Sequence, residues 1–203
     1  MNAFETYIAP KRAFIFSLDD VLYPEKDYLL QVYYLFAEFM EYTEQLPAKS
    51  ITQFMQSEYS HHGSVNIFEK TASKFDIAEK YKSNFELLHE NARLPLKLLL
   101  FQKVLSFLKE IVAEKKEIYL LVSGNPLMQL NKIKQLEWHG LAPFLKVYFS
   151  EELEPSLSVI SVDFVIEQNQ LQKEDILYIG SKAREQEIAQ EAGISFLLVT
   201  KLL

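Results

Sequence analysis

The sequence predicts an α/β fold: a three-layer parallel-sheet core that carries an inserted, all-helical domain. Short apolar runs alternate with helical patterns along the second half of the 203-residue chain, as they do in parallel sheets covered by helices. Between the first two apolar runs lie only helical patterns, roughly 75 residues of them, which far exceeds one crossover connection. We therefore expect a core formed by 1–24 and 98–203 and a helical insert at 25–97.

The expected strands are short and nearly all apolar, as burial on both faces of a parallel sheet requires. They are Ala13–Leu18, Ile118–Val122, Val147–Phe149, Ile176–Ile179 and Phe196–Val199. Apolar residues at helical spacing over Leu98–Val112 precede the second strand. Similar patterns separate the later strands, over Leu127–His139, Val159–Gln168 and Arg184–Ala192. Each strand after the first is thus followed or preceded by one covering helix.

The insert shows helical spacing throughout. Its first stripe recurs every three or four residues from Tyr28 to Met40, which is typical of an amphipathic helix. Further helices are expected over Ile51–Tyr59, Ile67–Phe75 and Ile77–Leu88. We expect the many aromatic residues of the insert to form its own hydrophobic core.

Composition restricts the partners and the compartment. The formal net charge of −7 argues against nucleic acid or an anionic membrane as a partner, because both attract basic patches. Cysteine is absent, which excludes disulfides, thiol nucleophiles and thiolate metal sites and fits a reducing compartment. No segment approaches the ~20 apolar residues that cross a bilayer. A soluble, cytoplasmic protein is expected.

Polar residues follow three of the strands at the sheet edge where parallel α/β folds place their sites. The first strand ends in Ser17-Leu18-Asp19-Asp20. The second ends in Ser123-Gly124-Asn125 before a helix, where free backbone N–H groups and the helix dipole favour an anion. A simple N-cap turn is the alternative for that segment. The fourth ends in Gly180-Ser181, with Glu185 nearby, which is also compatible with a generic strand-turn-helix.

These segments resemble the motifs of the haloacid dehalogenase-like hydrolases, and the resemblance covers essentially the whole chain. The nearest pattern is the branch of phosphoglycolate phosphatases, β-phosphoglucomutases and pyrimidine nucleotidases. It implies a Rossmann-like core, a helical cap in place of the insert, a Mg²⁺ cofactor and a small phosphorylated metabolite as substrate. It also implies that Ser123, Gly124 and Asn125 bind the phosphate.

The reactive positions depart from that family pattern. The position of the nucleophilic Asp holds Ser17, while Asp19 matches the acid/base. The position of the phosphate-binding Lys, just before a proline, holds Glu154. The metal ligands that the resemblance implies are the backbone carbonyl of Asp19, Ser181 in place of an Asp, and Glu185. A serine hydroxyl is a poor nucleophile without an activating base, and fewer carboxylates weaken Mg²⁺ binding.

Three interpretations follow from these departures. The first is a catalytically impaired member of the family that serves as a binding or regulatory module. The second is a Mg²⁺-dependent, phosphatase-like hydrolase with a rearranged site, using Ser17 or a water activated by Asp19. The third is a structural partner whose cap aromatics form an interface. The sequence leaves the choice between monomer and homodimer open, as it does the identity of the ligand.

Overall fold

The structure is a computed structural model that describes residues 4–203, so the first three residues of the expected core segment 1–24 lie outside it. Five parallel strands form one sheet in the order β5-β3-β1-β6-β7. They are β1 (Ala13–Phe16), β3 (Glu117–Val122), β5 (Leu145–Phe149), β6 (Ile176–Gly180) and β7 (Ser195–Leu198). The five predicted strands are confirmed to within two residues at each end.

Strand β1 lies at the centre of the sheet. It pairs with β3 on one side and β6 on the other, with Ile15 opposite Tyr119 and Tyr178. All four residues of β1 are fully buried, which explains its unbroken apolar sequence. The strand order reverses beside β1, and the carboxyl ends of β1, β3 and β6 therefore meet at one crevice.

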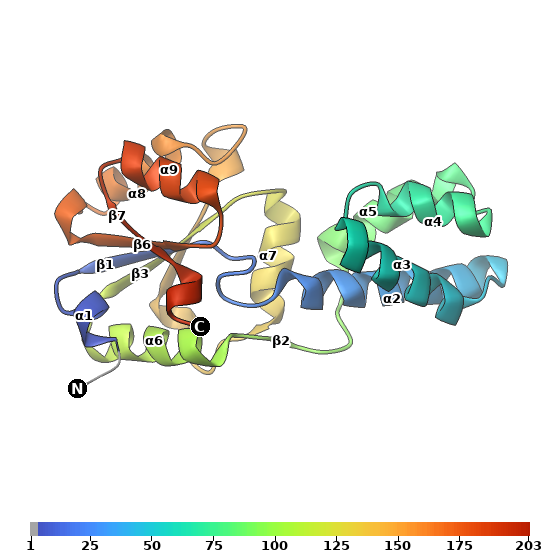
Figure 1. Ribbon diagram of the computed structural model, residues 1–203, viewed down its shortest axis with the longest axis horizontal. Coiled ribbons are helices and arrows are strands. Elements are labelled where there is room, and N and C mark those ends of the chain that lie inside the picture. Colours follow the sequence, from blue (N-terminus) through green and yellow to red (C-terminus); the bar gives the residue numbers. More distant parts are fainter. Residues whose placement is uncertain (1–3) are drawn as a thin grey trace.

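Helices cover both faces of the sheet (Figure 1). They are α1 (Glu5–Ile8), α6 (Gln102–Ala113), α7 (Pro126–Gln135), α8 (Val159–Gln168) and α9 (Ala183–Glu191). Alternate residues of a strand face opposite sides, so Phe14 packs against Phe107 of α6, whereas Ile15 belongs to the cluster that contains Val162 of α8 and Ile188 of α9. Short 3₁₀ turns complete the described chain: η1 (Glu79–Tyr81), η2 (Ala142–Phe144), η3 (Ser150–Glu152), η4 (Lys173–Asp175) and η5 (Val199–Lys201).

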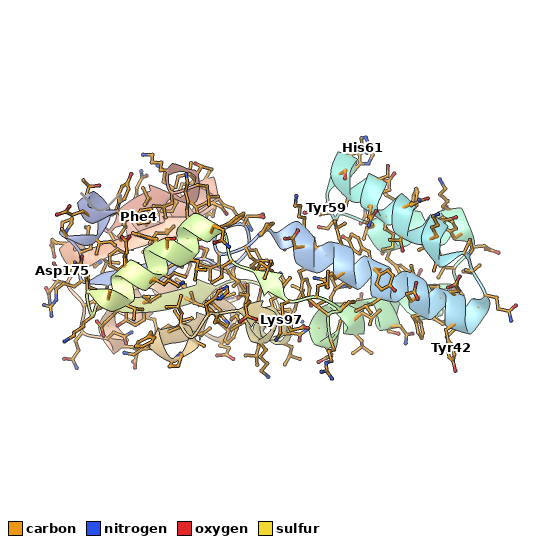
Figure 2. The ribbon with its side chains drawn as sticks, turned by 90° about the horizontal axis from the view of Figure 1, so that it is seen from below. Phe4, Tyr42, Tyr59, His61, Lys97 and Asp175 are labelled. Atoms are coloured by element: carbon orange, nitrogen blue, oxygen red, sulfur yellow. The ribbon has the colours of Figure 1, made fainter. Side chains whose placement is uncertain are left out.

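The cap helices form a separate group at one end of the molecule (Figure 1). They are α2 (Glu25–Glu44), α3 (Ala48–His62), α4 (Ile67–Phe75) and α5 (Lys82–Asn91). Phe36 of α2 contacts Phe68 of α4 and Phe85 of α5, with ring centroids 5.9 and 5.0 Å apart. The aromatic residues of the insert therefore pack on one another as expected, but in a hydrophobic cluster that also includes Phe14 and Phe16 of the sheet and is not a separate core. Figure 2 shows Tyr42 at the far end of the cap and Tyr59 at the end nearer the sheet.

Several helix boundaries differ from the prediction: α3 extends beyond Ile51–Tyr59 at both ends, and α5 begins at Lys82, after η1, instead of at Ile77. Leu98–Leu99 forms strand β2, which pairs in parallel with β4 (Leu136–Glu137). Helix α6 therefore begins at Gln102, and α7 ends at Gln135 instead of His139. Both residues of the pair Leu98–Leu136 are buried, and hydrophobic periodicity does not distinguish such a short buried strand from one more helical turn. Within residues 4–203, no helix is both long and apolar enough to cross a membrane.

Candidate functional site

A pocket of about 270 Å³ lies at the carboxyl edge of the sheet. We call it the sheet-edge pocket; the polar side chains and loops that line it include Ser17, Asp19, Ser123, Gly124, Lys182 and Glu185. These residues follow β1, β3 and β6, which the sheet order places side by side. Most of the residues predicted for the site are thus brought together, because each comes directly after a neighbouring parallel strand.

Ser17 is buried beside a phenol. Its side chain is 6% exposed, and its Oγ lies 3.0 Å from the Tyr178 hydroxyl, which projects from β6. Burial, reinforced by the charge of Glu185, raises the pKa of Tyr178 well above its ordinary value. Tyr178 is therefore neutral and unable to deprotonate the serine. Among the described side chains, it is the one hydrogen-bonded to the Ser17 hydroxyl.

Asp19 is held by three donors. Its Oδ1 accepts a hydrogen bond from the Tyr23 hydroxyl at 2.6 Å. Its Oδ2 is 2.7 Å from the Lys132 ammonium and 3.1 Å from the Gln129 amide nitrogen. The Lys132 side chain is completely buried and the Asp19 side chain is only 11% exposed, so solvent screens this ion pair weakly. An acid/base role for Asp19 would require breaking these contacts.

Helix α7 supplies two of those donors. Its N-terminus is capped by Asn125, whose side-chain oxygen accepts hydrogen bonds from the Leu127 and Met128 backbone. Gln129 and Lys132 lie three residues apart and therefore on one helical face. Gln129 also donates to the Ser123 carbonyl at 2.7 Å. Neither Gln129 nor Lys132 was predicted as a site residue from the sequence. Their spacing after the helix cap was the available signal, but a lysine is expected at the surface because lysines are seldom fully buried.

An internal carboxylate occupies the predicted anion cradle. The Gly124 N–H donates to Glu151 Oε1 at 2.6 Å, and the Ser150 hydroxyl donates to Glu151 Oε2 at 2.7 Å. Glu154, which the sequence placed at the cradle, is not among the residues that line the pocket. The turn η3 folds the chain back after β5, with the Glu154 N–H bonded to the Ser150 carbonyl. The structure thus puts Glu151, rather than Glu154, beside Gly124.

The loop after β6 is organised around Glu185. This carboxylate is buried, and its Oε2 accepts hydrogen bonds from the backbone N–H groups of Ser181 and Lys182, at 2.7 and 2.9 Å. It thereby caps α9. A side chain at position 180 would collide with its neighbours, since a Cβ on Gly180 would lie 2.5 Å from Glu185 Oε2 and 2.8 Å from the Phe196 ring.

The expected metal ligands do not fit a Mg²⁺ ion. Magnesium requires nearly octahedral oxygen ligands at about 2.0–2.1 Å. Positions 17 and 181 offer serine hydroxyls in place of carboxylates, and one oxygen of Glu185 is held by two N–H groups. Residues 4–203 contain no group of three or more His, Asp or Glu side chains arranged for a metal. The Lys132 ammonium is the cation that neutralises Asp19 in this structure.

Comparison with known proteins gives a consistent result. The family model described as "Haloacid dehalogenase-like hydrolase" matches residues 14–199. Similar solved structures are a hydrolase from Streptococcus pneumoniae TIGR4 (18% identity, 93% of this chain and 92% of that chain, TM-score 0.54) and a haloacid dehalogenase-like hydrolase from Xanthomonas campestris (15%, 92% and 80%, TM-score 0.56).

A third similar structure is the HAD-hydrolase YfnB from Bacillus subtilis, bound to magnesium (16% identity, 92% of this chain and 87% of that chain, TM-score 0.55). At these identities the structural matches show a shared fold. No curated protein matches the chain.

Proposed function

Since the chain belongs to the haloacid dehalogenase-like hydrolase family, we propose that it is a member without the standard phosphoryl-transfer chemistry that serves as a binding or regulatory module. One observation carries the proposal. The position that would hold the nucleophilic carboxylate holds Ser17, whose hydroxyl is buried against the neutral phenol of Tyr178. An alcohol without an activating base attacks phosphorus poorly.

The charges around the sheet-edge pocket support the same proposal. Glu25 and Glu185 line it, and Glu151, outside the lining, already accepts the Gly124 N–H that a phosphate would need. Repulsion between unit charges 4 Å apart amounts to about 4 kcal/mol at an effective dielectric constant near 20. A phosphate dianion would therefore bind weakly unless Glu151 moved away or took up a proton.

The proposal also includes the domain boundaries, the cellular compartment and the oligomeric state of the protein. We assign 25–97 to the cap and 1–24 with 98–203 to the core. The contact between Asn125 after β3 and Glu90 of α5 joins the two parts, with 2.7 Å between the amide nitrogen and the carboxylate. A cytoplasmic protein, monomeric or homodimeric, fits the absence of cysteine and the net negative charge.

A second candidate function is a Mg²⁺-dependent hydrolase of a small phosphorylated metabolite with a rearranged site. Two features favour it. The Lys182 side chain lines the sheet-edge pocket and supplies a positive charge there. The Ser181 hydroxyl oxygen is buried and has no hydrogen-bond partner within residues 4–203, so it is free to bind an ion or a phosphate.

Hydrolysis assays distinguish the two candidates. A panel of phosphomonoesters with and without Mg²⁺ is tested on the wild type, on Asp19→Asn and on Asp76→Asn. Asp76 is an exposed residue of the cap. Asp76→Asn therefore removes the same charge as Asp19→Asn but leaves the sheet-edge pocket unchanged. We expect background rates for all three proteins. Mg²⁺-dependent turnover that disappears in Asp19→Asn and persists in Asp76→Asn would establish the hydrolase instead.

A further inference from the structure

A second cavity, of about 390 Å³, lies between the cap helices and α7. We call it the cap cavity; its lining includes Glu25, Tyr33, Phe85, Glu86, His89 and Glu90. It adjoins the sheet-edge pocket, since Glu25 and Met128 line both. Figure 1 shows α2 and α5 approaching α7, the helices that contribute most of these residues. Its volume suits a small molecule.

The lining carries negative charge. Glu25, Glu86 and Glu90 contribute three carboxyl groups, and none of the residues that line the cavity in the described structure is a lysine or arginine. Burial lowers the pKa of His89, so its imidazole is neutral at pH 7. Glu90 is fixed by the Asn125 amide at 2.7 Å. Lys132 compensates Glu25 at 3.4 Å, so Glu86 and Glu90 leave the net negative charge that disfavours phosphate and favours a cation.

Aromatic rings form another part of the lining. The Phe85 and His89 rings pack edge to face with centroids 4.4 Å apart, and the Tyr33 ring is stacked 6.2 Å from Phe85. The Tyr59 ring, which is outside the lining, lies 6.2 Å from Tyr33. Aromatic faces attract organic cations, and they bind alkyl groups on the nitrogen as well.

An unpartnered polar group points independently to a ligand. Tyr33 is completely buried and lines the cap cavity, yet its hydroxyl has no hydrogen-bond partner in the described part of the chain. Leaving such a group unsatisfied destabilises the folded protein. Buried polar groups of this kind are normally satisfied by protein, ordered water or a bound molecule.

The protein already binds one alkylammonium group in this way next to the cavity. The Lys132 ammonium lies 2.7 Å from Asp19, 3.4 Å from Glu25 and 5.1 Å from the centroid of the Tyr28 ring. Carboxylates and an aromatic face thus hold a buried cation within the fold. Glu25 belongs to both environments, because it contacts Lys132 and lines the cap cavity.

We propose that the cap cavity binds a small organic cation, a primary or quaternary alkylammonium group held by the Phe85 and Tyr33 rings and by the Glu86 and Glu90 carboxylates. A hydroxyl or carbonyl of the same molecule then pairs with the Tyr33 hydroxyl. This inference rests on the proposed function in one respect: the molecule is bound as a ligand and is not a phosphoester that the protein hydrolyses.

Calorimetric titration at low ionic strength tests the proposal with four probes: choline, n-butylammonium, inorganic phosphate and 3,3-dimethyl-1-butanol, the uncharged isostere of choline. We expect choline to bind at least about tenfold more tightly than its isostere, because cation–π and carboxylate attraction act on the charged molecule alone. Phosphate is expected to give no saturable signal. Equal binding of choline and its isostere, or binding of phosphate alone, would overturn the proposal.

Variants locate the binding. Glu86→Gln, on an exposed residue, and the double change Glu86→Gln with Glu90→Gln should each weaken choline binding, the double change by about tenfold or more. Glu38→Gln, an exposed carboxylate of α2 outside the cavity, serves as the matched control and should leave it unchanged. An equal effect of Glu38→Gln, or none in the double variant, would contradict the assignment.

The proposed function and the proposed ligand of the cap cavity can be refuted independently of each other. Phosphomonoester hydrolysis by the wild type would refute the proposed function without touching the choline titration. Absence of choline and butylammonium binding in a protein that shows no hydrolysis would refute only the ligand assignment.

Discussion

The sheet-edge pocket and the cap cavity are neighbours that differ in how their charged groups are paired. In the first, Asp19 is paired with Lys132, Glu151 accepts the Gly124 N–H, and Glu185 caps its own loop. In the second, the buried Tyr33 hydroxyl has no partner within residues 4–203. The carboxylates at the family's site of chemistry are thus paired internally, although the buried Gln129 Oε1 there also has no partner within residues 4–203. Location within a fold therefore does not by itself indicate where a ligand binds.

The largest effect is expected from Lys132→Met. It leaves Asp19 and Glu25 close together without their buried cation, and breaking such a pair costs about 3–5 kcal/mol of unfolding free energy. Urea denaturation measures the loss. Lys134→Met, an exposed lysine of the same helix, should cost little. A loss below about 1 kcal/mol for Lys132→Met would mean that this ion pair does not hold the sheet-edge pocket together.

Gly180→Ala should rank next. The added Cβ would collide with Glu185 Oε2 and the Phe196 ring, and overpacking of this kind costs about 1–3 kcal/mol. Thermal and urea denaturation both report it. Ser181→Ala, one residue later, removes a hydroxyl that has no described partner and should be nearly neutral. If Gly180→Ala were also neutral, the tight packing around Glu185 would be disproved.

Two tyrosine-to-phenylalanine changes compare the pockets directly. Tyr178→Phe removes the partner of the Ser17 hydroxyl and should destabilise the protein by about 1 kcal/mol. Tyr33→Phe removes an unpartnered hydroxyl and should be neutral or slightly stabilising without ligand. Urea denaturation of both variants measures the difference. The reverse order of stabilities would contradict the description of both pockets.

The smallest effect concerns pH. Burial, and secondarily the charge of Asp19, raise the pKa of Glu25 above its ordinary value of 4.5, while Lys132 opposes this in part. The folded protein therefore takes up this proton at higher pH than the unfolded chain, so this group adds stability as pH falls through the raised pKa toward 4.5.

Glu25→Gln should accordingly be slightly more stable than the wild type at pH 7 and gain less stability on mild acidification. Urea denaturation between pH 7 and 5 measures this difference. A variant that is less stable at pH 7 would show that the attraction of Glu25 to Lys132 outweighs the cost of its burial.

The sheet could be predicted from the sequence because burial of a strand on both faces requires a continuous apolar run, which is recognisable in the sequence alone. The sequence also predicted that Ser17, Ser123 and Ser181 follow strands of the sheet, since that depends only on the order of the elements along the chain. It missed Lys132, Tyr178 and Glu151, whose roles arise from contacts between distant segments. Nothing in the local pattern around Lys132 distinguishes a buried, paired lysine from a solvated one.

The most decisive measurement is a crystal structure of the protein soaked in Mg²⁺ with a phosphate mimic such as vanadate. We predict that Asp19 stays paired with Lys132, that Glu151 stays on the Gly124 N–H, and that neither ion occupies the sheet-edge pocket. Magnesium coordinated beside Ser17 and Glu185, with the mimic bound to Ser17 or to the Gly124 N–H, would contradict the loss of phosphoryl-transfer chemistry.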